Sequence, residues 1–194
     1  MDVFAATDDD VKRLREALQA ADYTTATVRD VLGDEGFAAL LRDDLPRVLR
    51  ATGGGSQLET LIRLLFAGTS VDATAAAAAL PTASLDDWVG IGLLVRDGDT
   101  VAAPVLIRPY DVNDRPAWIA HDRLPRSGPA PADIVMGIGP ASTTLVNATI
   151  RRPVATTLDL GTGCGIQALH AATHSNHVVA LTAVRARLLA RRSP

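Results

Sequence analysis

The sequence has little cysteine, few aromatic residues and no long apolar run. Cys164 is the single cysteine, so no internal disulfide can form. Aromatic residues make up 4% of the chain, which leaves a core built mainly from Leu, Val, Ile and Ala. No apolar stretch approaches the roughly 20 residues that span a bilayer, and the N-terminus lacks the basic and apolar regions of a signal peptide. We therefore expect a soluble, cytoplasmic protein with no membrane partner.

Basic residues are scarce in most of the chain. Residues 1–150 hold 13 Lys and Arg against 21 Asp and Glu, whereas residues 151–194 hold six Arg and one acid. An acidic surface disfavours nucleic-acid binding, so we expect no DNA partner. For the basic final segment, residues 184–194, we favour an Arg- and Ala-rich tail that results from a shift of the coding frame near Ala180. The alternatives are a solvated helical tail and a basic amphipathic helix for RNA or an acidic membrane.

Residues 1–107 predict short helices followed by a β-hairpin. Four positions precede helical apolar patterns and are expected to act as N-caps: Thr7, Thr24 or Thr25, Ser56 and Ser84. Asp87 completes a capping box with Ser84. The hairpin is expected to join residues 93–96 to residues 101–107 around Gly98. This order resembles a winged-helix module, and the lack of a basic helix favours a packing role over DNA reading.

Residues 108–133 are rich in Pro and Asp around one expected strand, 117–120. This composition predicts a linker and docking segment. A strand and turn are expected over residues 134–140, followed by a helix over residues 141–150.

The most informative segment is a glycine-rich loop between two apolar strands. Residues 154–160 predict a strand, Gly161, Gly163 and Gly165 a loop, residues 166–173 a helix, and residues 177–181 a second strand. This is a βαβ unit, whose loop lies at the carboxyl edge of the sheet. Glycine suits such a loop because it permits a tight turn and a close approach of ligand to backbone.

Three interpretations of the loop compete with an ordinary tight turn. The dinucleotide fingerprint G-x-G-x-x-G fails at its third glycine, and the phosphate-binding P-loop lacks its lysine. The remaining pattern, acid-x-Gly-x-Gly-x-Gly, starts at Asp159. It resembles motif I of Rossmann-like, class I methyltransferases that use S-adenosylmethionine (SAM). The wider run Leu-Asp-Leu-Gly-Thr-Gly-Cys-Gly resembles the small-domain branch that contains glutamine-N5 and RNA-base methyltransferases.

The resemblance covers about residues 134–180 and implies a fold, a cofactor and a site. SAM is the implied cofactor, and the implied cofactor-binding residues are Asp159, Gly161, Thr162, Gly163, Cys164 and Gly165. The upstream segment 139–144 is placed to help cover the cofactor. The implied activity is methyl transfer from SAM to a nitrogen of a protein side chain or an RNA base. The methyl acceptor is therefore expected to be a protein or an RNA.

The chain departs from this family after the second strand. Family members place an acid at that strand end to bind the ribose hydroxyls, but residues 180–184 read Ala-Leu-Thr-Ala-Val. The family's catalytic Asn-Pro-Pro-aromatic loop has no counterpart, since Asn113, Asn147 and Asn176 all precede residues other than proline. We therefore predict a chain truncated after motif I, with no catalytic residues and no activity alone. A shift of the coding frame near Ala180 would account for the break.

Together these patterns predict an α/β chain, α+β overall, in four segments. They are a winged-helix-like helical domain (1–107), a linker (108–133), a truncated SAM-binding domain with the first βαβ unit of an incomplete Rossmann-like sheet (134–183), and a basic tail (184–194). The alternative function is a non-enzymatic interaction module in the N-terminal segment.

Two further readings of the glycine-loop region concern metal and thiol chemistry. His170, His174 and His177, with Cys164, have a spacing that can ligate zinc, but we expect no metal site and place both helical histidines on the outer face. Cys164 lies before a helix N-terminus, which could lower its pKa.

Overall fold

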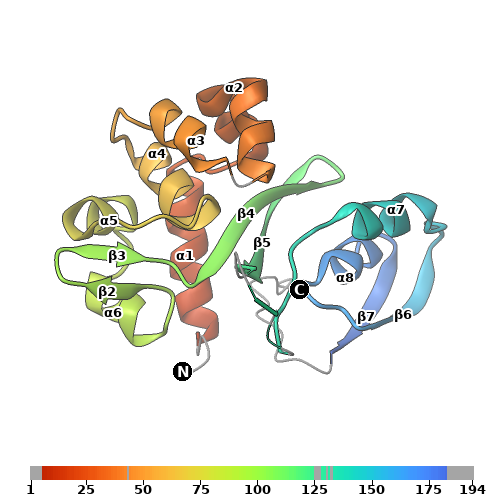
Figure 1. Ribbon diagram of the computed structural model, residues 1–194. Helices are drawn as coiled ribbons and strands as arrows, with labels where there is room; N and C mark the ends of the chain where they lie inside the picture. The colour runs from red at the N-terminus through yellow and green to blue at the C-terminus, as the bar shows by residue number, and fades with distance from the viewer. Residues whose placement is uncertain (1–5, 43, 125–127, 130, 132, 183–194) are drawn as a thin grey trace. The chain divides into compact units, whose positions relative to one another are not determined.

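A computed structural model describes residues 6–42, 44–124, 128–129, 131 and 133–182 (Figure 1). The predicted basic tail, 184–194, lies outside these residues. The chain is an α+β protein, as the sequence predicts. It divides into two compact units, Met1–Pro109 and Tyr110–Pro194, called here the N-terminal and C-terminal units.

The N-terminal unit consists mainly of short helices. They are α1 (Asp8–Ala20), α2 (Thr25–Leu41), α3 (Leu45–Ala51), α4 (Gln57–Leu61) continued by the π-helical turn η1 (Ile62–Phe66), α5 (Ala73–Ala79) and α6 (Leu85–Gly90). Of these, α1, α2, α4 and α6 begin at the predicted caps. Thr7, Thr24, Ser56 and Ser84 each form a capping box, which confirms the four predicted helix starts. Gly33, with φ of 67°, marks a kink within α2.

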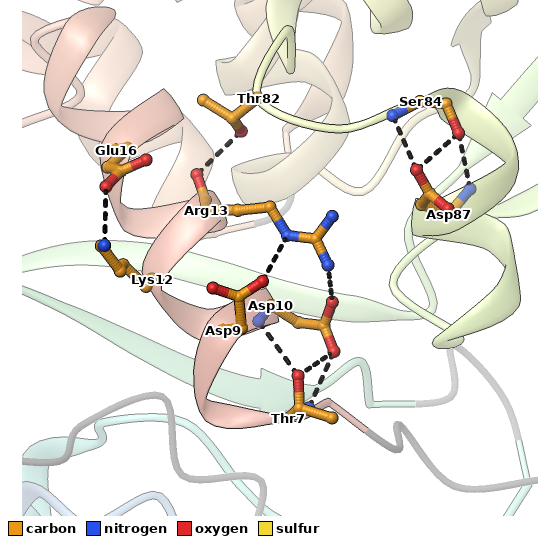
Figure 2. A network of polar contacts seen from close by, with 9 residues as sticks. All are labelled: Thr7, Asp9, Asp10, Lys12, Arg13, Glu16, Thr82, Ser84 and Asp87. Carbon is orange, nitrogen blue, oxygen red and sulfur yellow. Dashed lines mark hydrogen bonds and ion pairs between the residues drawn. The ribbon is translucent and has the colours of Figure 1, made fainter.

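The first cap belongs to a polar network at the start of α1 (Figure 2). The Asp10 carboxylate accepts hydrogen bonds from the backbone N–H and hydroxyl of Thr7, at 2.8 and 2.6 Å. Its other oxygen lies 2.5 Å from the Arg13 guanidinium. The Thr7 hydrogen bonds lower the pKa of Asp10, so the carboxylate remains ionised although it is buried. Thr82 donates to the Arg13 carbonyl and joins the network to the segment before α6.

The second half of the N-terminal unit has the connectivity of a winged helix. After η1 come β1 (Val71–Asp72), α5, α6, β2 (Val95–Asp97) and β3 (Thr100–Ala102). The strands form an antiparallel sheet in the order β1-β3-β2, in which Val71 pairs with Val101 and Arg96 also pairs with Val101. Trp88 of α6 is buried and donates its indole N–H to the Leu80 carbonyl.

The first part of the predicted linker and docking segment is a hairpin, whose second strand contains the predicted strand 117–120. β4 (Val105–Val112) and β5 (Arg115–Asp122) form a two-stranded sheet of their own, so residues 105–107 belong to β4 and not to the wing. Asn113 and Asp114 connect the strands with φ of 49° and 59°. Two adjacent left-handed residues are the requirement of a tight type I′ turn, and Asn and Asp tolerate that conformation.

The predicted strand at residues 134–140 does not form. Instead, Asp122 holds Val135: its carboxylate accepts from the Val135 N–H, and its own N–H donates to the Val135 carbonyl. Gly137 packs so closely on the buried His121 ring that an added Cβ would lie 2.9 Å from it. Side-chain packing therefore fixes this segment without a ladder of hydrogen bonds.

The predicted helix and βαβ unit that follow are present. They comprise α7 (Pro140–Ala148), β6 (Val154–Leu160), α8 (Ile166–Ala171) and β7 (Ser175–Leu181). β6 and β7 pair in parallel, with Leu158 opposite Val179 and Leu160 opposite Leu181. A small apolar core contains Ile119, Val135, Val146, Cys164 and Ile166.

One face of the β6–β7 sheet carries exposed leucines. Leu158, Leu160 and Leu181 are 54%, 71% and 51% exposed, and their register places them on the same face. Parallel sheets are normally covered on both faces. The described part of the chain thus presents a parallel sheet with one uncovered apolar face. Such a face favours self-association of the isolated chain.

Candidate functional site

The candidate site is the glycine loop between the end of β6 and the start of α8. Gly161, Gly163 and Gly165 have φ of 76°, 52° and 83°, a region that L-residues with side chains seldom adopt. An added Cβ at Gly161 would meet nothing within 4 Å, and one at Gly163 would meet only the Gly161 carbonyl, at 3.9 Å. The backbone conformation demands glycine here, and the space beside it is open to a ligand.

Asp159 holds the shape of the loop. Its carboxylate accepts a hydrogen bond of 2.7 Å from the Thr162 hydroxyl, three residues further along the chain. Thr162 is 5% exposed, so its hydroxyl needs a partner inside the protein. The acid and the threonine of the motif therefore form one unit that closes the loop.

The first N–H groups of the loop are already used. Gly161 and Thr162 donate to the Leu181 carbonyl at the end of β7, at 2.8 and 3.0 Å, and Gly165 donates to the Thr162 carbonyl at 2.8 Å. These bonds fix the loop at the carboxyl edge of the sheet. A ligand would consequently meet the open backbone surface of the glycines and not a ring of free N–H donors.

Cys164 is part of the core and is not an activated thiol. It is 7% exposed, and burial raises its pKa, with a smaller opposing effect of the Ile166 and Cys164 backbone N–H groups. The expectation that the helix N-terminus lowers this pKa is wrong, because desolvation of the thiolate is the larger effect. Cys164 acts as a small apolar residue beneath the loop.

The upstream segment predicted to cover a cofactor lies close to the start of α8. Gln167 donates its side-chain amide to the Ser142 carbonyl in the first turn of α7, at 3.0 Å. This bond brings Ser142, within the segment 139–144, beside the first turn after the glycine loop. Leu145 and Ile150 are exposed, and Val146 is the residue of α7 that enters the core.

The histidine of α8 differs from expectation. His170 was expected on the outer face but is 8% exposed, and its Nε2 lies 2.9 Å from the Tyr110 hydroxyl of β4. Within the part of the chain that the structure describes, no group of three or more His, Cys, Asp or Glu could hold a metal ion. The periodicity Ile166, Leu169, His170 places the histidine on the apolar stripe of the helix, which is the signal that would have found it.

The end of β7 carries no acid. Leu181 is the last strand residue, and Thr182 follows it. A ribose-binding carboxylate therefore has no counterpart at this position, in agreement with the sequence.

The known-protein comparisons bear on the other unit. Residues 20–104 match the model of a domain of unknown function, DUF7059. No curated protein matches the chain. The DUF7059 match contains the whole winged-helix segment and ends before the glycine loop, so it describes the N-terminal unit alone.

The helix of this segment that would contact DNA bases carries negative charge in its first turn. In a winged helix the second helix of the helix–turn–helix, here α6, presents its N-terminal residues to base edges. Asp86 and Asp87 are exposed at that position, and the Ser84 hydroxyl lowers the pKa of Asp87 and keeps it ionised. Two carboxylates facing the phosphate backbone would oppose binding. Among the described residues, no helix is both long and apolar enough to cross a membrane.

Proposed function

We propose that the C-terminal unit carries the first part of a SAM-binding site of the class I methyltransferase type. The observation that supports this proposal most strongly is the glycine loop: an acid at the end of a parallel strand, bonded to Thr162, followed by three left-handed glycines and a helix. A dinucleotide fingerprint and a P-loop remain excluded by spacing and by the missing lysine.

The chain's own residues would hold the cofactor by shape. Gly161 and Gly163 would let the methionine and sugar part of SAM lie against the backbone, while Asp159 and Thr162 keep the loop closed beneath it. Ser142 and its neighbours in α7 would flank the ligand from the side of Gln167. When bound, SAM supplies the methyl group that such enzymes transfer to a nitrogen.

The proposed substrate class is a protein side chain or an RNA base, by the resemblance of the motif. The residues that would position that nitrogen are not present in the sequence, so we expect the chain alone to bind SAM without transferring its methyl group. Without an acid at the end of β7, affinity should be about ten- to a hundredfold lower than with it, because a charge-assisted hydrogen bond contributes roughly 1.5–3 kcal/mol.

Equilibrium dialysis of the purified chain against radiolabelled SAM tests the proposal. We expect saturable binding that S-adenosylhomocysteine displaces and that ATP and NAD do not. Displacement by ATP or NAD with equal efficiency would instead indicate a general nucleotide site. The absence of saturable binding at millimolar ligand would reject the proposal.

A second candidate function is a protein-interaction module in the N-terminal unit. The strand order β1-β3-β2 and the acidic first turn of α6 favour it, because winged-helix modules with acidic helices are better suited to proteins than to nucleic acid. The fragment 1–109 should then fold alone and bind a defined protein partner. Failure of the fragment to fold would count against this candidate.

A further inference from the structure

A contact between the half-buried Tyr110 and the buried His170 connects α8 to β4 within the C-terminal unit. His170 Nε2 lies 2.9 Å from the Tyr110 hydroxyl, and the two rings meet edge to face with centroids 5.7 Å apart. Tyr110 packs against the apolar core of the unit, which also contains Ile166 and Cys164. The pair thus joins the helix that follows the glycine loop to a strand sixty residues earlier.

The second nitrogen of His170 is buried without a hydrogen-bond partner in the described structure. A neutral imidazole has one donor and one acceptor nitrogen, so one of its two groups is unsatisfied in either tautomer. Protonation would turn both nitrogens into donors and bury a net charge. The unpaired nitrogen then becomes a charged N–H without an acceptor, which is costlier than an unpaired neutral atom.

The charges around the pair oppose protonation as well. Burial lowers the pKa of His170 from its ordinary 6.5, and Arg151, just after α7, lowers it further. Burial raises the pKa of Tyr110, Arg151 opposes this effect, and Asp111, beside Tyr110 in β4, adds to it. His174, the next histidine along the chain, lies near the Thr173 hydroxyl. Both Tyr110 and His170 are therefore neutral near pH 7.

The position of α8 determines the position of the loop. Leu169 donates its N–H to the Gly165 carbonyl at 2.9 Å, which ties the first turn of α8 to the last glycine. Ile166 and Cys164, on either side of Gly165, are both buried in the core. A displacement of α8 from β4 would carry these residues and the loop with it.

We propose that Tyr110 and His170 form a pH-sensitive latch that holds α8, and with it the glycine loop, in its ligand-binding position, and that acidification opens it. The identity of the ligand depends on the proposed function, whereas the contact between Tyr110 and His170 does not. The latch contributes fully to the stability of the folded state above about pH 6.5, where His170 is neutral in both folded and unfolded chains. Its contribution falls as the pH drops from there towards the lower pKa of the folded state.

The test measures hydrogen exchange of the α8 amides and SAM affinity of the full chain at about pH 7.5 and 5.5. Linkage to a group with an ordinary pKa of 6.5 allows up to about a tenfold loss of protection and affinity over this interval. His170→Gln keeps an amide that can reach Tyr110 but does not titrate, so both quantities should then be independent of pH. His174→Gln is the matched control and should keep the wild-type loss.

A pH dependence that survives His170→Gln would overturn the latch, because another group would then be responsible. If His170→Gln does not fold, the imidazole of wild-type His170 can be titrated by NMR. Its midpoint should lie below 6.5 and coincide with loss of α8 protection, and a midpoint at or above 6.5 would refute the proposal. No SAM binding at pH 7.5 rejects the proposed function instead and leaves the hydrogen-exchange test intact.

Discussion

Replacing Gly161 with alanine tests whether the left-handed backbone of the loop is a structural requirement. Gly161 has φ of 76°, and an added Cβ would meet nothing within 4 Å, so the substitution introduces conformational strain without a steric clash. A left-handed L-residue costs about 1–2 kcal/mol. We therefore expect Gly161→Ala to lower the free energy of unfolding of the C-terminal unit by that amount.

The matched control is Gly139→Ala in the same unit. Gly139 has φ of −117° and open space around its Cα, so alanine fits there with little strain. Its stability should stay within about 0.5 kcal/mol of the wild type, which is usual for surface substitutions.

The assay is denaturant unfolding of both variants, with hydrogen exchange of the peptide that spans β6 and α8 as a local probe. For a unit of this size each kcal/mol corresponds to roughly 4–8 °C in melting temperature, so thermal scans can resolve the difference. Equal stability of Gly161→Ala and Gly139→Ala would refute the argument, since it would mean that the loop does not depend on a left-handed residue.

Two further substitutions probe hydrogen bonds to carboxylates. Thr162→Val removes the hydrogen bond to Asp159 and should lower the free energy of unfolding of the C-terminal unit by about 1.5–3 kcal/mol, measured with denaturant. The control is Thr149→Val, which loses an exposed hydroxyl bond to a helix carbonyl. It should change the free energy of unfolding by less than about 0.5 kcal/mol. A loss no greater than that of Thr149→Val would show that the Asp159 bond does not hold the loop. Because the pKa of Asp10 is lowered in the folded state, its contribution to the N-terminal unit is present above about pH 3.8 and disappears as the pH falls through the folded value. Acid titration of stability should be shallower in Asp10→Asn than in the wild type, by about 1 kcal/mol; identical titrations of the variant and the wild type would contradict this assignment.

Local chemistry explains why so many element boundaries can be predicted from the sequence. A helix start depends on one hydroxyl and the residue three positions later, as at Thr7 with Asp10 and Ser84 with Asp87. The glycine loop is equally local, since its acid, its glycines and its flanking strands lie within about 30 residues. These features require no knowledge of the rest of the chain.

The errors arise where distant packing decides the outcome. The Pro- and Asp-rich composition after residue 107 predicts a linker, but the adjacent pair Asn113 and Asp114, between Val112 and Arg115, is the turn signal that identifies the hairpin. His170 lies on the apolar stripe of α8, but no spacing within the helix predicts that its partner is Tyr110 of β4. Burial raises the pKa of the Cys164 thiol, although its position before a helix predicts a lowered pKa.

The central claim is that the loop from Gly161 to Gly165 binds SAM. The most direct test is to add SAM to the isotopically labelled chain and map which backbone amide signals shift by NMR. The account predicts saturable shifts at the loop and in the first turns of α7 and α8, with the N-terminal unit unaffected. Shifts confined to other residues, or none at millimolar SAM, would contradict it.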